Sequence, residues 1–324
     1  MPVISSASGQ KASSFCFGTM QFGGTSSDAE SAAVFEQCRA HAINFFDCAF
    51  GYNNGTSETL LGGFIAPERE NLIVTTKCAH PGGSGRANIL AQFDTSRKRL
   101  ATDYIDVYFL HRWDDTVPLE ETFDALAGLV QAGHVRHLGV SNFSAWQTMK
   151  ALAVAAKMGL RIDVLQPMYS LIKRQAEVEI LPMAKAEDMA VTPYSPLGGG
   201  VLTGKYLSGN SGRITTDNAY AARYAPDWMA QTAADLSTLA ADIGVLAITL
   251  AVAWVARNPT IAAPIISGRN PGQLAPSLAA MSYEMSDEIY ARVSALSPTP
   301  PPATDRLEEA YTAPTSKPES FRGL

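Results

Sequence analysis

The stretch Asn44-Phe-Phe-Asp-Cys-Ala-Phe-Gly-Tyr52 begins as a short apolar run and ends in a turn rich in glycine and asparagine. Phe45 and Phe46 are typical of a buried strand, and Asp47 stands at the end of that strand with Tyr52 five residues later. An acid and a phenol in one loop after a strand can form part of an acid–base site. An ordinary loop between a strand and a helix, with a capping aspartate and a packing tyrosine, explains the same residues. The stretch alone therefore leaves both interpretations open.

The composition bounds the class of protein. The 324 residues have a formal net charge of −6, with 46% hydrophobic and 17% charged residues, so the chain can bury a large core. The acidic balance gives no support for nucleic-acid binding, and no apolar run approaches the ~20 residues of a membrane span. Residues 1–11 have no apolar signal core, and the four cysteines show no Cys-x-x-Cys spacing. We therefore expect reduced thiols in a cytoplasmic protein with no membrane partner.

Strand-like and helix-like segments alternate along the whole chain. The patterns predict strands over residues 15–18, 44–47, 71–77, 104–110, 135–140, 162–165, 189–192 and 261–266. They predict helices over residues 28–40, 56–64, 87–100, 119–132, 144–157, 175–186, 228–243, 246–257 and 270–280. This alternation implies parallel strands joined by right-handed crossovers. Eight such units without a break in composition favour an α/β fold of the closed (β/α)8 or TIM-barrel type, as a single domain over residues 1–296.

Two segments fall outside this repeating pattern. Residues 207–227 are too long for an ordinary connection, and they contain Arg213, Tyr220, Arg223 and Tyr224. We expect either a lid over a functional site or an exposed insertion. Residues 297–324 form a proline-rich tail, which we expect to be extended or to lie over the barrel mouth.

The predicted carboxyl ends of the strands carry polar and ionisable side chains. In a (β/α)8 barrel these ends face one common mouth. The residues concerned are Asp47, Lys77, His111, Asn142, Gln166 and Tyr194. Scattered core or capping roles would explain any one of them, but their shared position predicts a polar, ionisable site.

Three of these residues, Asp47, Lys77 and His111, together with Tyr52 suit proton transfer to a carbonyl oxygen. A phenol has an ordinary pKa of about 10, and a nearby ammonium lowers that pKa. With Lys77 beside it, Tyr52 would therefore be a better proton donor. Asp47 would hold Lys77 charged, and His111 would orient a carbonyl group. Together they fit proton delivery to the oxygen as a hydride reaches the carbonyl carbon.

Two other kinds of chemistry receive less support. Glycoside hydrolysis needs two carboxylates across a cleft, and only Asp47 clearly stands at a strand end, although Asp114 and Asp115 follow in a later loop. The pair His134 and His137 has the spacing of metal ligands but lacks an obvious third ligand, which catalytic zinc requires. We therefore predict no metal site.

The motifs in combination resemble the aldo-keto reductase superfamily over about residues 15–281. The resemblance is carried by Phe17-Gly-Thr-Met20, Asp47-x4-Tyr52, Lys77, Leu110-His111 and Gly139-Val-Ser-Asn-Phe143. Pro193-Tyr-Ser-Pro-Leu197 followed by Leu202-Thr-Gly-Lys-Tyr206 resembles the branch that contains bacterial reductases and potassium-channel β-subunits. The resemblance implies a catalytic tetrad of Asp47, Tyr52, Lys77 and His111, with Tyr52 as the general acid.

The resemblance also implies NADP(H) as cofactor. It places the nicotinamide carboxamide on Ser141, Asn142 and Gln166, with Tyr194 stacked on the ring. It places the pyrophosphate beside Ser195, Leu197, the turn around Gly199, and Lys205. It assigns the adenosine 2′-phosphate to Ser267, Arg269 and Gln273, where arginine can form two parallel bonds to phosphate. Thr19, Met20 and Asp47 complete the expected cofactor-binding set. Ser277 departs from the family pattern, because relatives often have an asparagine there that contacts adenine.

These expectations amount to an NADPH-dependent oxidoreductase that interconverts an aldehyde or ketone and the corresponding alcohol. The alternative is an NADP-binding regulatory subunit with slow or no turnover, as the channel β-subunits suggest; the intact tetrad favours catalysis. We expect a small apolar or ring-containing substrate, in contact with Phe22, Phe50, Tyr52, His111 and Trp113.

Overall fold

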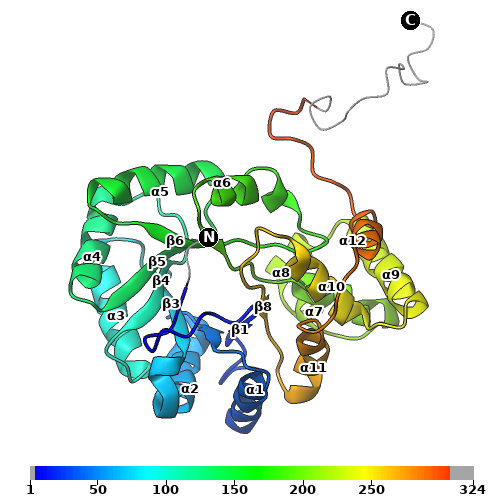
Figure 1. The fold of residues 1–324 in the computed structure, drawn as a ribbon, viewed down its shortest axis with the longest axis horizontal. Helices are drawn as coiled ribbons and strands as arrows, with labels where there is room; N and C mark the ends of the chain where they lie inside the picture. Colours follow the sequence, from blue (N-terminus) through cyan, green and yellow to red (C-terminus); the bar gives the residue numbers. More distant parts are fainter. Residues whose placement is uncertain (1–3, 307–324) are drawn as a thin grey trace, which may run out of the picture.

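The computed structural model describes residues 4–306, and within them eight parallel strands form one sheet (Figure 1). The strands are β1 (Cys16–Gly18), β2 (Phe45–Asp47), β3 (Ile73–Cys78), β4 (Ile105–Leu110), β5 (Val135–Ser141), β6 (Ile162–Gln166), β7 (Ala190–Val191) and β8 (Ile265–Ile266). Their order in the sheet follows the chain, and β8 pairs with β1. The amide of Ala262 donates to the Val191 carbonyl at 2.8 Å, and that of Ile265 to the Pro193 carbonyl at 2.9 Å. These bonds close the sheet, so the predicted (β/α)8 barrel is confirmed.

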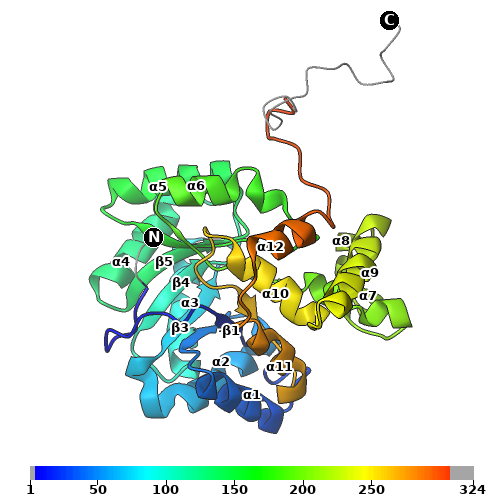
Figure 2. The same ribbon diagram turned by 45° about the vertical axis from the view of Figure 1, so that its right-hand side comes forward.

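Helices follow the strands and cover the outside of the barrel (Figures 1 and 2). They are α1 (Asp28–Ala40), α2 (Thr56–Ile65), α3 (Arg86–Arg99), α4 (Leu119–Gln131), α5 (Ala145–Lys157), α6 (Ile180–Ala186), α9 (Asp227–Asp242), α10 (Ala247–Arg257), α11 (Pro271–Ala279) and α12 (Asp287–Ser294). Local sequence determines where several of them begin. Ser27 and Glu30 form a reciprocal capping box at α1, and Ser144 and Gln147 form another at α5, which satisfies backbone amides that the first turn leaves free.

Three elements differ from the sequence-based prediction. The helix expected over residues 175–186 is divided into a 3₁₀ turn, η3 (Gln175–Glu177), and α6. Pro182 explains the division, because proline has no amide hydrogen for an intrahelical bond and is tolerated only in a first turn. The last strand is short, since only Ile265 and Ile266 join the ladder to β1. Helix α12 was not predicted; it begins at a Ser286 cap.

Segment 207–227 is not a structureless loop. It contains two short helices, α7 (Arg213–Thr216) and α8 (Asn218–Arg223), and the Asp217 side chain caps α8. These helices follow a glycine-rich 3₁₀ segment, η4 (Gly198–Thr203), which packs against α9. Both views place α7 and α8 close to α9, at the side of the molecule away from α4 (Figures 1 and 2). A lid role for the segment remains a prediction.

The proline-rich tail lies mostly outside the described residues. Its first residue, Ser297, is buried, and the Arg174 guanidinium donates to its carbonyl and hydroxyl oxygens. The described residues up to 306 then lead away from α12 in both views (Figures 1 and 2). The expected domain boundary at residue 296 remains a prediction.

An N-terminal hairpin closes the amino ends of the strands. Ser5 pairs with Lys11, and Ile4 joins the apolar cluster inside the barrel. The Arg136 guanidinium donates to the Ser5 carbonyl at 2.6 Å and forms an ion pair with the buried Asp106, which also pairs with Arg69. The polar side chains at this end therefore stabilise the fold. A functional site is expected at the opposite end, where the carboxyl ends of the strands lie.

Three further observations concern membranes, thiols and metals. Among residues 4–306, no single helix is long and apolar enough to cross a bilayer, although the bent pair α9 and α10 meets that test jointly by length and composition. All four cysteines are buried, and none forms a disulfide bond. The same residues contain no group of three or more histidine, cysteine or acidic side chains that could hold a metal ion.

Candidate active site

A buried ion pair forms the centre of the site. Lys77 Nζ lies 2.6 and 2.8 Å from the two Asp47 carboxylate oxygens and donates to the Cys48 carbonyl at 2.7 Å. Asp47 Oδ1 also accepts bonds from Thr75 Oγ1 at 2.8 Å and Gln166 Nε2 at 2.9 Å. A buried ion pair is tolerated when further hydrogen bonds satisfy both groups. Strands β2, β3 and β6 together meet this condition.

Tyr52 and His111 complete the predicted tetrad. The Tyr52 hydroxyl lies 3.5 Å from Lys77 Nζ, and its ring meets the His111 ring edge to face at a centroid distance of 6.1 Å. Tyr52 opens a short 3₁₀ segment, η1 (Tyr52–Gly55), after β2. His111 follows β4, and its amide donates to the Cys78 carbonyl at the end of β3. The structure therefore brings all four predicted catalytic residues together at the ends of β2, β3 and β4.

The electrostatics agree with the prediction only in part. Burial raises the pKa of Tyr52 to about 12, although the Lys77 ammonium acts to lower it. Lys77 thus acts in the predicted direction, but desolvation outweighs it, and the expected net lowering is not found. Burial, reinforced by the charge of Lys77, lowers the pKa of His111 to about 3. The imidazole is therefore neutral near pH 7, and its buried Nδ1 has no hydrogen-bond partner within the described residues.

Hydrogen bonds link the polar residues at the carboxyl ends of β5, β6 and β7 to one another and to the tetrad. The Tyr194 hydroxyl donates to Asn142 Oδ1 at 2.6 Å, and Asn142 Nδ2 donates to the His111 carbonyl at 3.0 Å. The Ser141 hydroxyl donates to the Gln166 carbonyl at 3.0 Å, while the Gln166 amide reaches Asp47. The four residues predicted to face a nicotinamide ring thus lie together with the tetrad. Their polar groups already bond to one another, so a bound carboxamide would join or replace these bonds.

The segment after β7 has the features of a phosphate cradle. Gly198, Gly199 and Gly200 have φ values of +55°, +64° and +94°, and a Cβ on Gly199 would lie 2.8 Å from the Tyr224 ring. The Gly198 and Gly200 amides donate to the Ser195 and Leu197 carbonyls at 2.9 and 3.0 Å, and a tight glycine turn of this kind lets a ligand approach the backbone closely. Lys205 lies beside the turn, with Nζ over the Tyr206 ring at 4.8 Å. Ser195 and Leu197, which precede the turn, are partly exposed.

Several positively charged side chains follow the carboxyl ends of strands. Within residues 4–306, no ion pair with a carboxylate involves Lys205, Arg112, Arg213, Arg223 or Arg269. The same holds for Lys98, Lys157 and Lys185 in the last turns of α3, α5 and α6, so unpaired cations occur at both ends of the barrel. Those that lie beside the glycine turn and the start of α11 suit a ligand with several phosphate groups.

The predicted 2′-phosphate residues lie at the start of α11. Arg269 is exposed, and its side chain and amide both donate to Gln273 Oε1 at 3.3 Å. The amino end of a helix favours an anion, so an exposed arginine there suits a phosphate. The Ser267 hydroxyl instead donates to the Gly18 carbonyl at 2.8 Å. The Ser277 hydroxyl is buried in the helix and has no hydrogen-bond partner among the described residues. These residues and the cradle together fit NADP(H).

Two predicted contacts are not presented to the site. Phe22 is fully buried and packs against Phe17 and Phe64 in the outer core. Thr19 is also fully buried, and its hydroxyl bonds to the Asp47 carbonyl and to Ser57. Both follow β1 in a tightly packed turn, so sequence position alone suggested exposure that packing removes. Met20 is partly exposed.

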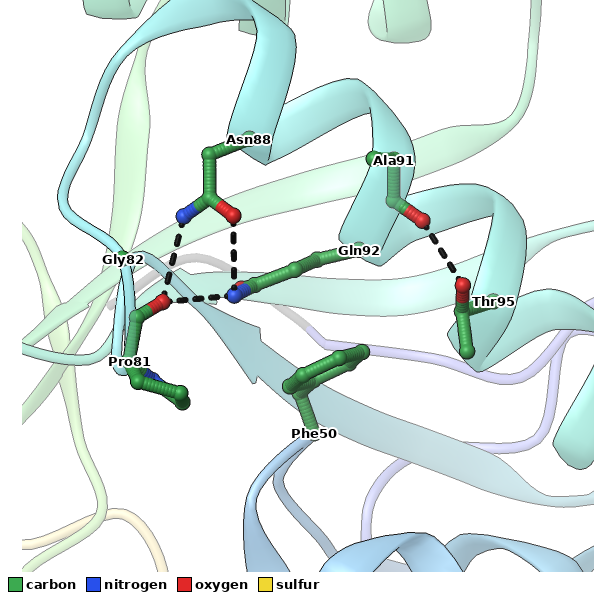
Figure 3. Close-up of a pocket in the computed structure, with 7 residues that line it drawn as sticks. All are labelled: Phe50, Pro81, Gly82, Asn88, Ala91, Gln92 and Thr95. Atoms are coloured by element: carbon green, nitrogen blue, oxygen red, sulfur yellow. Dashed lines mark hydrogen bonds between the residues drawn. The ribbon is translucent and has the colours of Figure 1, made fainter.

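Phe50 lies against α3, on the outer side of its loop. It lines a surface hollow of about 300 Å³ whose other lining residues are Pro81, Gly82, Asn88, Ala91, Gln92 and Thr95 (Figure 3). Asn88 and Gln92 donate to the Pro81 carbonyl, so the polar groups of this hollow are already satisfied. The tetrad does not line it.

Trp113 leads to a residue that the sequence did not single out. Its ring packs edge to face on Phe143 and on Trp146, both at 5.4 Å. Trp146, at the start of α5, is 61% exposed, and both tryptophans line a surface hollow of about 570 Å³. His80, whose ring lies 5.8 Å from that of His111, was also missed. A second aromatic residue soon after the Gly139–Phe143 motif was the available signal for Trp146.

The fold and the site together define a (β/α)8-barrel oxidoreductase. A sequence model described as "Aldo/keto reductase family" matches residues 14–298. The chain belongs to the aldo/keto reductase family.

Three relatives illustrate the range of that similarity. The chain is 33% identical to "Uncharacterized oxidoreductase YrpG" of Bacillus subtilis (strain 168), over 90% of this chain and 94% of the relative. It is 31% identical to "Probable voltage-gated potassium channel subunit beta" of Arabidopsis thaliana, over 97% and 98%. It is also 31% identical to "Norsolorinic acid reductase B" of Aspergillus parasiticus, over 88% and 81%.

Proposed function

We propose that this protein interconverts an aldehyde or ketone and the corresponding alcohol with NADP(H), using Tyr52 as the acid–base group. The observation that carries the proposal is the Tyr52 hydroxyl, 3.5 Å from the buried Lys77 ammonium and beside a neutral His111. NADPH, when bound, supplies the hydride for reduction. The protein's own residues supply the proton and stabilise the charge that its transfer leaves behind.

Each tetrad residue has one role in this reaction. Tyr52 donates its proton to the carbonyl oxygen as the carbon is reduced. The resulting phenolate is stabilised by Lys77, which Asp47 holds in place and keeps charged. His111, as a neutral imidazole, can donate a hydrogen bond that orients the carbonyl group. With a pKa of about 12, the Tyr52 phenol carries the proton that reduction requires at neutral pH, and Lys77 keeps that pKa from rising further.

The cofactor would be held by residues from four strand ends. We assign the nicotinamide side to Ser141, Asn142, Gln166 and Tyr194, and the pyrophosphate side to the Gly198–Gly200 turn with Lys205. Arg269 and Gln273 would bind the 2′-phosphate. The glycine cradle and the unpaired cations support this assignment.

The substrate we propose is a small carbonyl compound with an apolar ring. Trp113 follows His111 by two residues, and its ring continues the aromatic surface to Trp146. Aromatic side chains that remain exposed beside a site commonly stack on flat apolar ligands.

The second candidate function is an NADP-binding regulatory subunit with little turnover. The similarity to the Arabidopsis relative, which is named as a probable channel subunit, favours it. An intact tetrad, with an Asp47–Lys77 pair held by several hydrogen bonds, favours catalysis. The two are separated by whether NADPH is consumed with any carbonyl compound.

The test is the Tyr52→Phe variant, assayed by loss of NADPH absorbance across a panel of aldehydes and ketones. We expect turnover with wild type and at least a hundredfold loss in the variant, since only the proton donor is removed. NADPH binding, measured by fluorescence titration, should stay close to wild type. Tyr283→Phe, outside the site, is the matched control. Wild-type NADPH binding without turnover on any substrate would favour the regulatory function instead.

A further inference from the structure

The loop that carries Tyr52 has an unusual backbone. After Tyr52, three successive residues are left-handed: Asn53, Asn54 and Gly55, with φ values of +48°, +54° and +93°. Left-handed conformations of non-glycine residues cost free energy and persist when the surroundings hold them. We call residues 49–55 the tyrosine loop, and contacts with the surrounding residues must hold it in this conformation.

Arg99, the last residue of α3, contacts the tyrosine loop on both sides of Tyr52. Its Nη1 donates to the Phe50 carbonyl at 3.0 Å, and its guanidinium lies over the Phe50 ring at 4.7 Å. At the other end of the loop, a Cβ on Gly55 would lie 2.2 Å from Arg99 Cζ. Arg99 therefore fills the space behind the loop and packs against Phe50 and Gly55. Phe50 faces α3 in Figure 3, which agrees with this packing.

A buried carboxylate holds Arg99 in that position. Glu58, in the first turn of α2, is fully buried and pairs with Arg99 Nη1 at 3.1 Å. Its other oxygen accepts a 2.6 Å hydrogen bond from Thr76, the residue before Lys77 on β3. The tyrosine loop, the lysine strand and α3 are thus tied together through one charged side-chain pair. None of these contacts belongs to the tetrad itself.

We propose that Arg99 is a positioning residue that, with Glu58, sets the distance between the Tyr52 hydroxyl and the Lys77 ammonium. This inference rests on the function proposed above. The hydroxyl-to-ammonium distance of 3.5 Å is at the limit of a hydrogen bond, so a small shift of the loop separates the two groups. A displacement of about 1 Å can cost on the order of 100-fold in rate.

The inference has a signature that a purely structural role would not produce. Burial is the main cause of the raised pKa of Tyr52. Loosening the tyrosine loop moves Tyr52 away from Lys77, which by itself raises the pKa of Tyr52, but it also admits water. Because burial is the larger influence, the pKa of Tyr52 should fall from about 12 toward that of an ordinary phenol. Loss of stability elsewhere in the barrel would not move this titration.

The experiment uses a pair of variants and a control on the same helix. Arg99→Met alone would leave Glu58 as an unpaired buried charge and could prevent folding. The double variant Arg99→Met with Glu58→Gln removes both charges, and the new amide oxygen can still accept from Thr76. Arg99→Lys tests conservative rescue. Arg97→Met is the control, because the ion pairs that Arg97 forms within residues 4–306 are with Asp94 and Asp103 at the surface.

We expect the double variant to lose about 10- to 100-fold in kcat while NADPH binding, followed by fluorescence, changes little. The Tyr52 titration, taken as the ultraviolet difference between the variant and its Tyr52→Phe counterpart, should move to lower pH. Arg99→Lys should recover part of the rate. A folded double variant with wild-type kcat and an unmoved titration would overturn the inference. If wild type shows no carbonyl turnover, the proposed function fails, and the Tyr52 titration alone then decides the role of Arg99.

Discussion

The Lys77→Met variant tests the ion pair at the centre of the site. Methionine has nearly the length of lysine but no charge, so the substitution deletes the bonds from Nζ to both Asp47 oxygens and to the Cys48 carbonyl. Asp47 remains buried with only Thr75 and Gln166 as donors. Removing one partner of a buried pair costs about 3–5 kcal/mol, and we expect a loss of that size in the free energy of unfolding.

A double variant separates the buried charge from the packing. Asp47→Asn combined with Lys77→Met removes both charges, and the new amide oxygen can still accept from Thr75. Its loss of stability should be clearly smaller than that of Lys77→Met alone. Urea unfolding followed by tryptophan fluorescence measures both, with the exposed Lys98→Met as control. A single-variant loss below about 1 kcal/mol, or an equal loss in the double variant, would contradict the account of a buried pair stabilised by mutual neutralisation.

The same variant has a pH signature. Lys77 is the largest influence that lowers the pKa of Tyr52, so without it the pKa should rise further above about 12. Reduction needs the protonated phenol and would slow because the phenol is a poorer donor. Alcohol oxidation needs the phenolate, so it would lose more at neutral pH and recover as pH rises. The pH dependence of kcat/KM in both directions is the measurement, and an oxidation profile that does not move would show that Lys77 does not tune Tyr52.

Two further predictions concern the ligands. Arg269→Ala should weaken NADPH binding by about 1.5–3 kcal/mol, or about 10- to 150-fold, and leave NADH binding nearly unchanged, since only NADPH has the 2′-phosphate. Titration of both cofactors is the measurement, with Arg292→Ala as control. Equal losses for the two cofactors would mean that Arg269 has a structural role. Trp146→Ala should lower kcat/KM for a naphthaldehyde by up to about tenfold relative to a short aliphatic aldehyde, as expected for one lost aromatic contact. The exposed Trp228→Ala on α9 is its control, and an unchanged ratio would remove Trp146 from the substrate surface.

The barrel and the tetrad could be predicted from the sequence because both depend on local order. A strand appears as an apolar run, and the polar residue that ends it, such as Asp47, Lys77 or His111, must face the mouth once the fold is a closed barrel. The alternation of strands and helices, with the rule that strand ends share one mouth, was therefore enough to place these three residues together, although they are far apart in the sequence.

Other features depended on contacts that no local pattern contains. Arg99 is one of three basic residues in the last turn of α3, and its pairing with Glu58 is visible only when α2 and α3 lie side by side. Phe22 resembled a pocket residue, but three-dimensional packing buries it. The pKa of Tyr52 is the net result of burial against the charge of Lys77, and the sequence revealed only the charge.

Closure of the barrel divides the site into residues that can come together early in folding and residues that can join them only late. The strands that carry Asp47, Lys77 and His111 are consecutive neighbours, so these residues can meet while the sheet is still an open, growing ribbon. Pairing of β8 with β1, by contrast, joins residues such as Gly18 and Ser267 that are 249 positions apart, a slow, entropically costly loop closure. On a ribosome, the proton-transfer residues could assemble well before Arg269 emerges. Binding of the 2′-phosphate would thus be the last property acquired, because a chain that stalls before β8 would have the tetrad and the Gly198–Gly200 turn but neither Arg269 nor Gln273.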